Sequence, residues 1–237
     1  EGLSRNPDSL SVLIFIGRTF KELKQYDSAV LYLHRAIARD SNNLDAYVEA
    51  GHLYKEIGNN DSSIFYYSRA LVIKPDIRSV YSNLGFVYLK AAKWDSAVVY
   101  YKKAIDGFKQ LGGKEDSLSQ HAMYLLGDSY LKIGEKANAR NAFLFCASNS
   151  SNRTQKEISK FQYAKLSYEL GYQDEALNSL SSFLADYPNS TYSTEARDLM
   201  VLVLANTNNY KDALSMMDGL ANPSPTSKKM YPRILFG

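Results

Sequence analysis

Three glycines, each separated from the next by 34 residues, restrict the fold of this chain more than any other feature. They are Gly17, Gly51 and Gly85, and similar residue types recur at fixed distances after each of them. An aromatic residue follows at three positions, a small residue at twelve, a large apolar residue at sixteen and an alanine at nineteen. These sets are Phe20, Tyr54 and Tyr88; Ala29, Ser63 and Ala97; Leu33, Tyr67 and Tyr101; and Ala36, Ala70 and Ala104. Such self-similarity at a fixed period predicts stacked repeats.

The same pattern continues along the chain with longer spacings. Gly127 lies 42 residues after Gly85, and Ala164 and Val201 each take the glycine position after a further 37 residues. A glycine or small residue in one helix lets a second helix approach closely, and the large residue sixteen positions later fills the space that this leaves. Each unit is therefore predicted to be a pair of antiparallel helices joined by a short turn.

These residues resemble the tetratricopeptide repeat family. Its signature runs Leu-Gly-x-x-Tyr, then Ala, then an aromatic, then Pro, and the fourth unit has Leu126-Gly127-x-x-Tyr130 followed by Ala139 and Phe143. The resemblance covers nearly the whole chain and is of the bacterial type. It implies an all-α fold, a right-handed superhelical α-solenoid of helix–turn–helix repeats, with a concave groove lined by the first helix of each repeat.

The predicted organisation is a single array over residues 1–237. Pro7 lies where an upstream repeat would close, and the terminal Phe236-Gly237 lies where the next Leu-Gly pair would stand, so we expect a longer array. Residues 228–237 are either the start of a further repeat or a capping helix. The repeats are expected at about 10–43, 44–77, 78–111 (extended to 119), 120–153, 157–190 and 194–227, and are numbered 1 to 6 below.

Turn and cap residues support these bounds. Glycines at the ends of three first helices predict left-handed caps, and Pro75 and Pro188 follow second helices that proline cannot continue. Asp-Ser pairs open the second helices of repeats 1 to 3, where the side chains are expected to cap backbone amides. The glycines are Gly58, Gly134 and Gly171, and the pairs begin at Asp27, Asp61 and Asp95.

Two irregular stretches interrupt the array. The segment around 106–119 is expected to be a lengthened second helix that ends at Gly112-Gly113, followed by a restart near Asp116-Ser117. The polar stretch from Ser148 to Thr154 is expected to be a loop. Neither carries a ligand motif, so we interpret both as spacers.

Composition excludes several classes of function. The net charge is +3 and no block of Lys or Arg occurs, so no nucleic-acid partner is expected. No apolar run approaches the roughly 18 residues of a membrane span, so we expect no direct membrane insertion. The ending of repeat 5 resembles repeats common in bacterial envelope assembly, which favours the periplasm or cell envelope. The sequence predicts no particular oligomeric state.

No constellation of residues predicts catalysis, so the chain is not expected to be an enzyme, and neither a cofactor nor a metal is expected. None of His34, His52 and His121 has a second ligand at metal-binding spacing. Cys146 takes the position of the small residues nineteen after the glycine, and is expected to be a packed, inert thiol. Co-chaperone members of the family clamp a carboxylate with Lys and Asn on successive first helices, but neither register here supplies that pattern.

The remaining candidate is the groove, where the family resemblance places a protein or peptide partner. We predict a non-catalytic protein–protein interaction scaffold that holds a peptide or helix there. The alternative is a regulatory or substrate-docking region of a larger enzyme or signalling protein. A central apolar strip is expected to provide the anchors. The predicted contact residues are Arg18, His52, Lys55, Phe86, Leu89, Lys90, Tyr124, Asp128, Leu131, Phe161, Lys165 and Tyr168.

Overall fold

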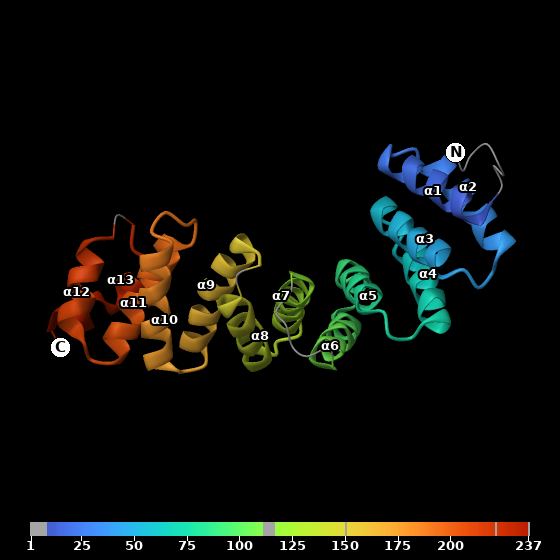
Figure 1. Ribbon diagram of the computed structural model, residues 1–237. Coiled ribbons are helices and arrows are strands. Elements are labelled where there is room, and N and C mark those ends of the chain that lie inside the picture. Colours follow the sequence, from blue (N-terminus) through green and yellow to red (C-terminus); the bar gives the residue numbers. More distant parts are fainter. Residues whose placement is uncertain (1–8, 111–116, 150, 221, 237) are drawn as a thin grey trace. The chain divides into compact units, whose positions relative to one another are not determined.

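The described part of the chain consists of helices joined by short turns. The computed structural model describes residues 9–110, 117–149, 151–220 and 222–236 (Figure 1). Within these residues there are thirteen helices and no strand, which confirms the predicted all-α fold. They are α1 Leu10–Glu22, α2 Tyr26–Arg39, α3 Leu44–Ile57, α4 Asn60–Ile73, α5 Arg78–Lys90, α6 Trp94–Gln110, α7 Ser117–Lys132, α8 Lys136–Ser148, α9 Arg153–Glu169, α10 Gln173–Asp186, α11 Ser193–Asn206, α12 Tyr210–Asp218 and α13 Pro225–Phe236.

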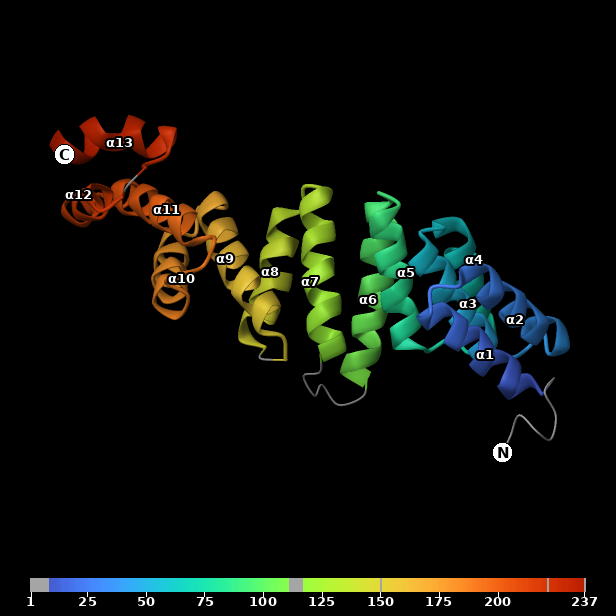
Figure 2. The ribbon, with the colours of Figure 1, turned by 90° about the horizontal axis from the view of Figure 1, so that it is seen from above.

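Contacts between the helices divide the chain into two compact units. Unit 1 spans residues 1–114 and holds the pairs α1/α2, α3/α4 and α5/α6. Unit 2 spans residues 115–237 and holds α7/α8, α9/α10 and α11/α12, with α13 packed on α11 and α12. Within each unit every helix packs on the next one in the chain (Figures 1 and 2).

The glycine position explains why the two helices of a repeat pack so closely. A Cβ atom built on Gly51 would lie 2.5 Å from Cδ1 of Tyr67, and one built on Gly85 would lie 2.8 Å from Cδ1 of Tyr101. Both tyrosines are fully buried. Only a hydrogen atom therefore fits between the helix backbone and the ring. Where Ala or Val replaces the glycine, in repeats 5 and 6, the residue sixteen positions later is the smaller Leu180 or Met217, and both are buried.

The turns between paired helices all adopt the left-handed backbone conformation at one residue. The three predicted glycines do so, which confirms the left-handed caps. The other three repeats use a residue with a Cβ atom at the same place. The φ angles are 84° at Gly58, 80° at Gly134 and 85° at Gly171, against 57° at Lys24, 55° at Ala92 and 59° at Asn208.

The predicted capping by the Asp-Ser pairs is wrong where caps are described. Asp27 lies inside the first turn of α2, whose N-cap is Gln25 and makes no side-chain cap bond. In α4 the N-cap is Asn59, whose side chain accepts a hydrogen bond from the backbone N–H of Ser62 at 3.0 Å. The pairs begin two residues after the N-cap, at Asp27 and Asp61, and so cannot cap the helix. The acidic residues instead lie beside the positive end of the helix dipole.

The polar loop between α8 and α9 is held by a buried side chain. Gln120 is fully buried, and its amide donates to the backbone O of Asn152 at 3.1 Å and accepts from the backbone N of Asn152 at 2.6 Å. Asn152 then caps α9 by accepting from the N–H of Gln155 at 2.9 Å. A sequence that looks like a spacer is therefore tied to α7 by specific hydrogen bonds.

Several predictions concern residues that lie close to, or beyond, the ends of the described segments. α6 has 17 residues, compared with 14 in α2 and α4, in agreement with the expected lengthening. Gly112-Gly113, Asp116, Pro7 and Gly237 lie outside the described residues. α13 begins at Pro225 and buries Ile234 in a cluster with Met217.

Among the described helices, none is long and apolar enough to cross a bilayer.

Candidate partner-binding surfaces

Six of the predicted residues lie on the first helices of unit 1, and contacts connect five of them, all but Leu89. Arg18 comes from α1, His52 and Lys55 from α3, and the other three from α5. Arg18 and Lys90 are exposed, whereas the rest are half-buried. We call this set the unit 1 first-helix surface: Arg18, His52, Lys55, Phe86, Leu89 and Lys90.

A buried carboxylate organises one side of this surface. Glu49 is only 9% exposed and binds Nη2 of Arg18 at 2.8 Å and Nζ of Lys21 at 3.3 Å, with Nδ1 of His52 at 3.9 Å. Burial alone would raise the pKa of Glu49, but the contact with His52 and the charges of Lys21 and Arg18 lower that pKa to about 2. Glu49 is therefore ionised and its charge is already neutralised by α1.

The neighbouring group of side chains, around Lys55 and Asn83, contains no carboxylate of this kind. Nζ of Lys55 donates to Oδ1 of Asn83 at 2.6 Å, and Nδ2 of Asn83 lies 3.3 Å from Nε2 of His52. Burial, and next the charge of Lys21, lower the pKa of Lys55, while the charge of Glu56 opposes them. Among the described residues, Lys55 forms no ion pair with a carboxylate.

Phe86 stands between two ammonium groups on this surface. Nζ of Lys55 lies 5.9 Å from the centre of its ring and Nζ of Lys90 lies 5.4 Å from it. Both distances are within the range of a cation–π contact. The arrangement presents a half-buried aromatic ring beside two ammonium groups, neither of which forms an ion pair with a carboxylate among the described residues.

The residues predicted from the sequence to line the groove include neither Glu49 nor Asn83, although a signal for both was present. Lys21 and Glu49 are 28 residues apart, and so are Lys55 and Asn83. A basic residue four after the glycine position thus contacts an acceptor two before the next glycine position. The same pair of positions recurs one repeat later, so the spacing would have predicted both contacts.

The first helices of unit 2 present a different surface, on which Lys165 of α9 is paired with an acid. Its Nζ donates to Oε1 of Glu195, on α11, at 2.7 Å. Nζ of Lys136, at the start of the second helix α8, lies 2.9 Å from Oε2 of Glu169 on α9. The half-buried predicted residues are Tyr124, Asp128, Leu131, Lys165 and Tyr168.

The aromatic residues of this unit are used largely for packing. The ring of Tyr124 meets the buried Phe143 edge-on at 6.1 Å, and Leu131 packs on the same cluster. Burial, and next the charge of Asp128, raise the pKa of Tyr124. Tyr168 packs against the cluster of α9, α10 and α11. Part of each of these side chains remains at the surface.

The expectation that Phe161 is exposed is wrong. Its side chain is 1% exposed, and its ring stacks on Tyr192 at 4.8 Å and lies 5.6 Å from Phe183. Tyr192 is the N-cap of α11, and its ring covers the ring of Phe161 on α9. An added aromatic residue at the start of repeat 6 therefore makes Phe161 part of the core.

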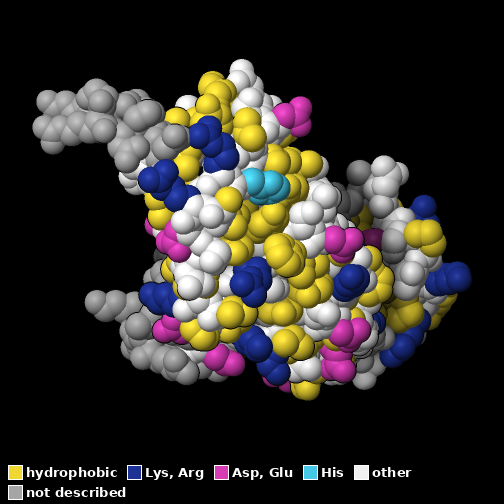
Figure 3. Space-filling model, turned by 90° about the vertical axis from the view of Figure 1, so that its right-hand side faces the viewer, with side chains coloured by type: hydrophobic (Ala, Val, Ile, Leu, Met, Phe, Trp, Pro, Cys, Tyr) yellow, Lys and Arg dark blue, Asp and Glu magenta, His cyan; other side chains and the backbone are white. Residues whose placement is uncertain are grey.

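Other candidate groups are also accounted for. Cys146 is fully buried, its thiol donates to the backbone O of Gln120 at 3.3 Å, and burial raises its pKa to about 12, as expected for a packed thiol. Nε2 of His34 and the hydroxyl of Tyr66 are hydrogen-bonded at 2.8 Å. The residues with described positions include no group of three or more His, Cys, Asp or Glu able to hold a metal ion. On the face shown in Figure 3, hydrophobic, basic and acidic side chains are intermixed.

Comparison with known proteins agrees with this architecture. Sequence models of the tetratricopeptide repeat match residues 10–43, 44–77, 76–144 and 159–190. The chain therefore belongs to the tetratricopeptide repeat family, whose fold serves generally as a protein-interaction scaffold. No curated protein sequence matches the chain significantly.

Several solved structures share the fold at low sequence identity. YrrB, described as a TPR protein with an unusual peptide-binding site, is 19% identical with a TM-score of 0.64, over 86% of this chain and 95% of its own. MamA is 19% identical with a TM-score of 0.63, over 76% of this chain and 92% of its own. PilF of Pseudomonas aeruginosa is 17% identical with a TM-score of 0.59, over 94% and 92%. At these identities the similarity extends to the fold alone.

Proposed function

We propose that the unit 1 first-helix surface binds an extended segment or a helix of a partner protein that presents an acidic side chain beside an apolar one. The observation that carries this proposal is the group formed by Lys55, Phe86 and Lys90. An anion placed there would meet two ammonium groups, and an apolar neighbour would cover the half-buried ring.

The charge balance of the surface supports an acidic partner. Glu49 is compensated by Arg18 and Lys21, so its charge does not compete for Lys55. The lowered pKa of Lys55 means that its positive charge is disfavoured by burial and by Lys21. A carboxylate from a partner would relieve this cost, because an opposite charge favours the ionised form of a base.

Selection of peptides from a random library on the purified full chain tests the proposal. We expect enriched sequences to carry Asp or Glu next to an aromatic or aliphatic residue. Their affinity should fall on Lys55→Ala and on Phe86→Ala, and should weaken as salt rises. Lys102→Ala on α6 is the matched control, because it removes an exposed lysine from a second helix of the same unit. Selected peptides that bind both variants as tightly as the parent chain would contradict the proposal.

A further inference from the structure

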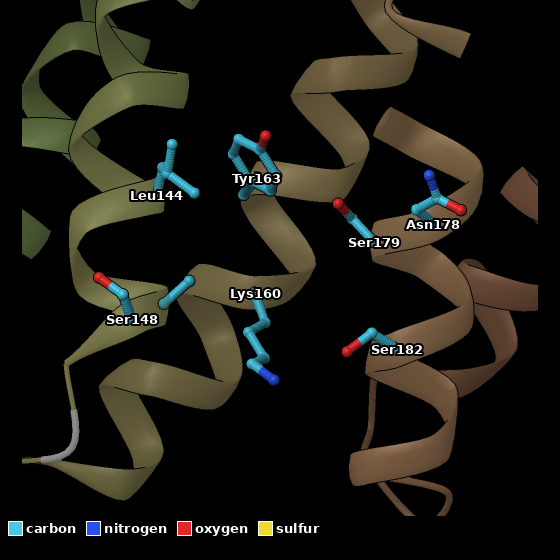
Figure 4. Close-up of a pocket in the computed structure, with 8 residues that line it drawn as sticks. Leu144, Ser148, Lys160, Tyr163, Asn178, Ser179 and Ser182 are labelled. Carbon is cyan, nitrogen blue, oxygen red and sulfur yellow. The ribbon is translucent and has the colours of Figure 1, made fainter. Parts of the chain in front are cut away.

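Unit 2 contains a pocket of about 320 Å³ between α8, α9 and α10. Figure 4 shows Leu144 and Ser148 on one side, Ser179 and Ser182 on the opposite side, and Tyr163 and Lys160 between them. None of these residues belongs to the first-helix surfaces described above. The pocket is lined by Leu144, Ala147, Ser148, Lys160, Tyr163, Asn178, Ser179 and Ser182.

The repeat register shows what occupies the corresponding place in unit 1. Three positions are relevant: four before the glycine position, three after it and fifteen after it. All three are tyrosine in repeats 2 and 3, whereas repeat 5 has Lys, Ser and Ser. The sets are Tyr47, Tyr54 and Tyr66; Tyr81, Tyr88 and Tyr100; and Lys160, Ser167 and Ser179.

In repeat 2 the ring of Tyr66 fills the space between three helices. It stacks on Tyr54 with centres 5.2 Å apart and planes within 2°, and lies 6.2 Å from Tyr47. Its hydroxyl reaches Nε2 of His34, on α2 of the preceding repeat, at 2.8 Å. His34 stands seventeen residues after its glycine position, where repeat 4 has Leu144 of the pocket wall.

Repeat 3 shows the same arrangement. The ring of Tyr100 stacks on Tyr88 with centres 5.0 Å apart, and lies 6.3 Å from Tyr81. The tyrosine fifteen after the glycine position is thus used twice to fill the junction with the preceding repeat.

In repeat 5 the replacing side chains turn to other partners. Oγ of Ser167 accepts from Nε of Arg140 at 2.8 Å, and the guanidinium of Arg140 lies over the rings of Tyr163 and Tyr172. Nζ of Lys160 binds Oδ2 of Asp186. Ser179 is too short to fill the junction. The pocket is the space that a tyrosine ring occupies in unit 1.

We propose that this pocket binds an aromatic side chain, with a preference for tyrosine, from a segment of a partner protein. Leu144, Ala147 and Tyr163 supply apolar contacts for the ring, and Leu144 is 45% exposed without it. In Figure 4 the hydroxyls of Ser179 and Ser182 face the pocket, and a phenol hydroxyl can both donate to and accept from such groups. The volume is near the lower end of small-ligand sites, roughly 300–1,000 Å³, and suits one side chain. This inference does not rest on the unit 1 surface.

Titration of the full chain with N-acetyl-tyrosinamide tests the proposal. The measured signals are the methyl resonances of Leu144 and Ala147, and N-acetyl-phenylalaninamide and N-acetyl-leucinamide are the matched probes. We expect shifts at both residues, and tyrosine binding up to about tenfold tighter than leucine, because ring contacts and a polar tip both contribute. Absence of shifts, or equal affinity for tyrosine and leucine, would overturn the proposal.

A variant that restores the tyrosine of repeats 2 and 3 locates the site. Ser179→Tyr should keep the fold and remove the probe-induced shifts, because the chain then fills its own pocket. Ser215→Tyr, an exposed position on α12 outside the pocket, should leave the shifts unchanged. If Ser179→Tyr does not fold, Leu144→Lys is the second variant. We expect it to abolish the probe-induced shifts as well. Probe binding that persists in a folded form of either pocket variant overturns the assignment.

Discussion

Units 1 and 2 use the same framework inside each repeat but fill the junctions between repeats differently. In both units the residues twelve and sixteen after the glycine position are buried, as with Ala29 and Leu33 in unit 1 and Ala176 and Leu180 in unit 2. At the junctions, unit 1 stacks tyrosines where repeat 5 has lysine and serine.

The first-helix surfaces of the two units differ as well. In unit 2, Lys165 is paired with Glu195, whereas Lys55 of unit 1 contacts an amide and an aromatic ring. The positions within a repeat are fixed by helix packing, so variation is confined to positions between repeats and at the surface. Those positions are where binding specificity can differ without loss of the fold.

The largest expected effect is a difference in stability between the alanine variants of Phe161 and Phe86, which the sequence pattern predicts to have the same role. Phe161→Ala should lower the free energy of unfolding by about 3–5 kcal/mol, because it removes a buried ring from contact with Phe183 and Tyr192. Phe86→Ala should cost about 1 kcal/mol, since that ring is half-buried and mainly contacts two lysines. Urea unfolding followed by circular dichroism measures both. Equal losses would remove the distinction between core and surface aromatics.

The tyrosine junction of unit 1 provides the second test. Tyr66→Ser introduces the residue of repeat 5 and should cost about 2 kcal/mol through lost apolar burial and a lost stacked pair. Tyr66→Phe keeps the ring and loses only the hydrogen bond to His34, so it is the matched control. The thermal unfolding of both variants gives the comparison. A serine variant as stable as the phenylalanine variant would show that the junction needs no aromatic ring.

The third test uses the pH dependence of unit 1. The pKa of Glu49 is lowered from 4.5 to about 2, so its ionisation stabilises the fold above pH 4.5 and this contribution is lost as pH falls towards 2. Glu49→Gln should cost about 1–2 kcal/mol at pH 7, and the difference from the parent chain should shrink below pH 4.5.

A second acid of the same network serves as the control for Glu49. Glu22 has a side chain that is 72% exposed and lies 3.4 Å from Nζ of Lys21. Glu22→Gln should therefore change stability little at any pH. Urea unfolding at pH 7, 4.5 and 3 measures both variants, and a pH-independent difference for Glu49→Gln would contradict the assignment.

The smallest expected effect concerns the turns. Ala92→Gly should raise stability by about 1 kcal/mol, because alanine is strained at a φ of 55° and glycine is not. Gly134→Ala should lower it by a similar amount, since nothing lies within 4 Å of the added Cβ and only the backbone is strained. Melting temperatures measure the pair. Effects of the same sign would show that contacts, rather than φ, determine these positions.

The sequence alone predicts the helix pairs and most of their cores, because the period repeats in residues such as Gly51 and Tyr67, whose sizes are complementary. It does not predict the burial of Phe161, which depends on Tyr192, nine residues before Val201, where repeats 2 and 3 have Asn42 and Asp76. Nor does it predict the pocket, which exists because Ser179 is small. The absence of a tyrosine ring at Ser179 is recognised as a pocket only when the packing of neighbouring repeats is compared.

The one cysteine of the chain can report how fast two helices of unit 2 separate. Cys146 on α8 is fully buried against α7, and burial raises the pKa of its thiol to about 12, so the thiol is un-ionised at pH 7. A thiol reagent can therefore modify it efficiently only after α8 separates from α7. The rate of labelling measures how often these two helices open, without any added reporter group, and a ligand that holds the fourth and fifth repeats closed will slow it.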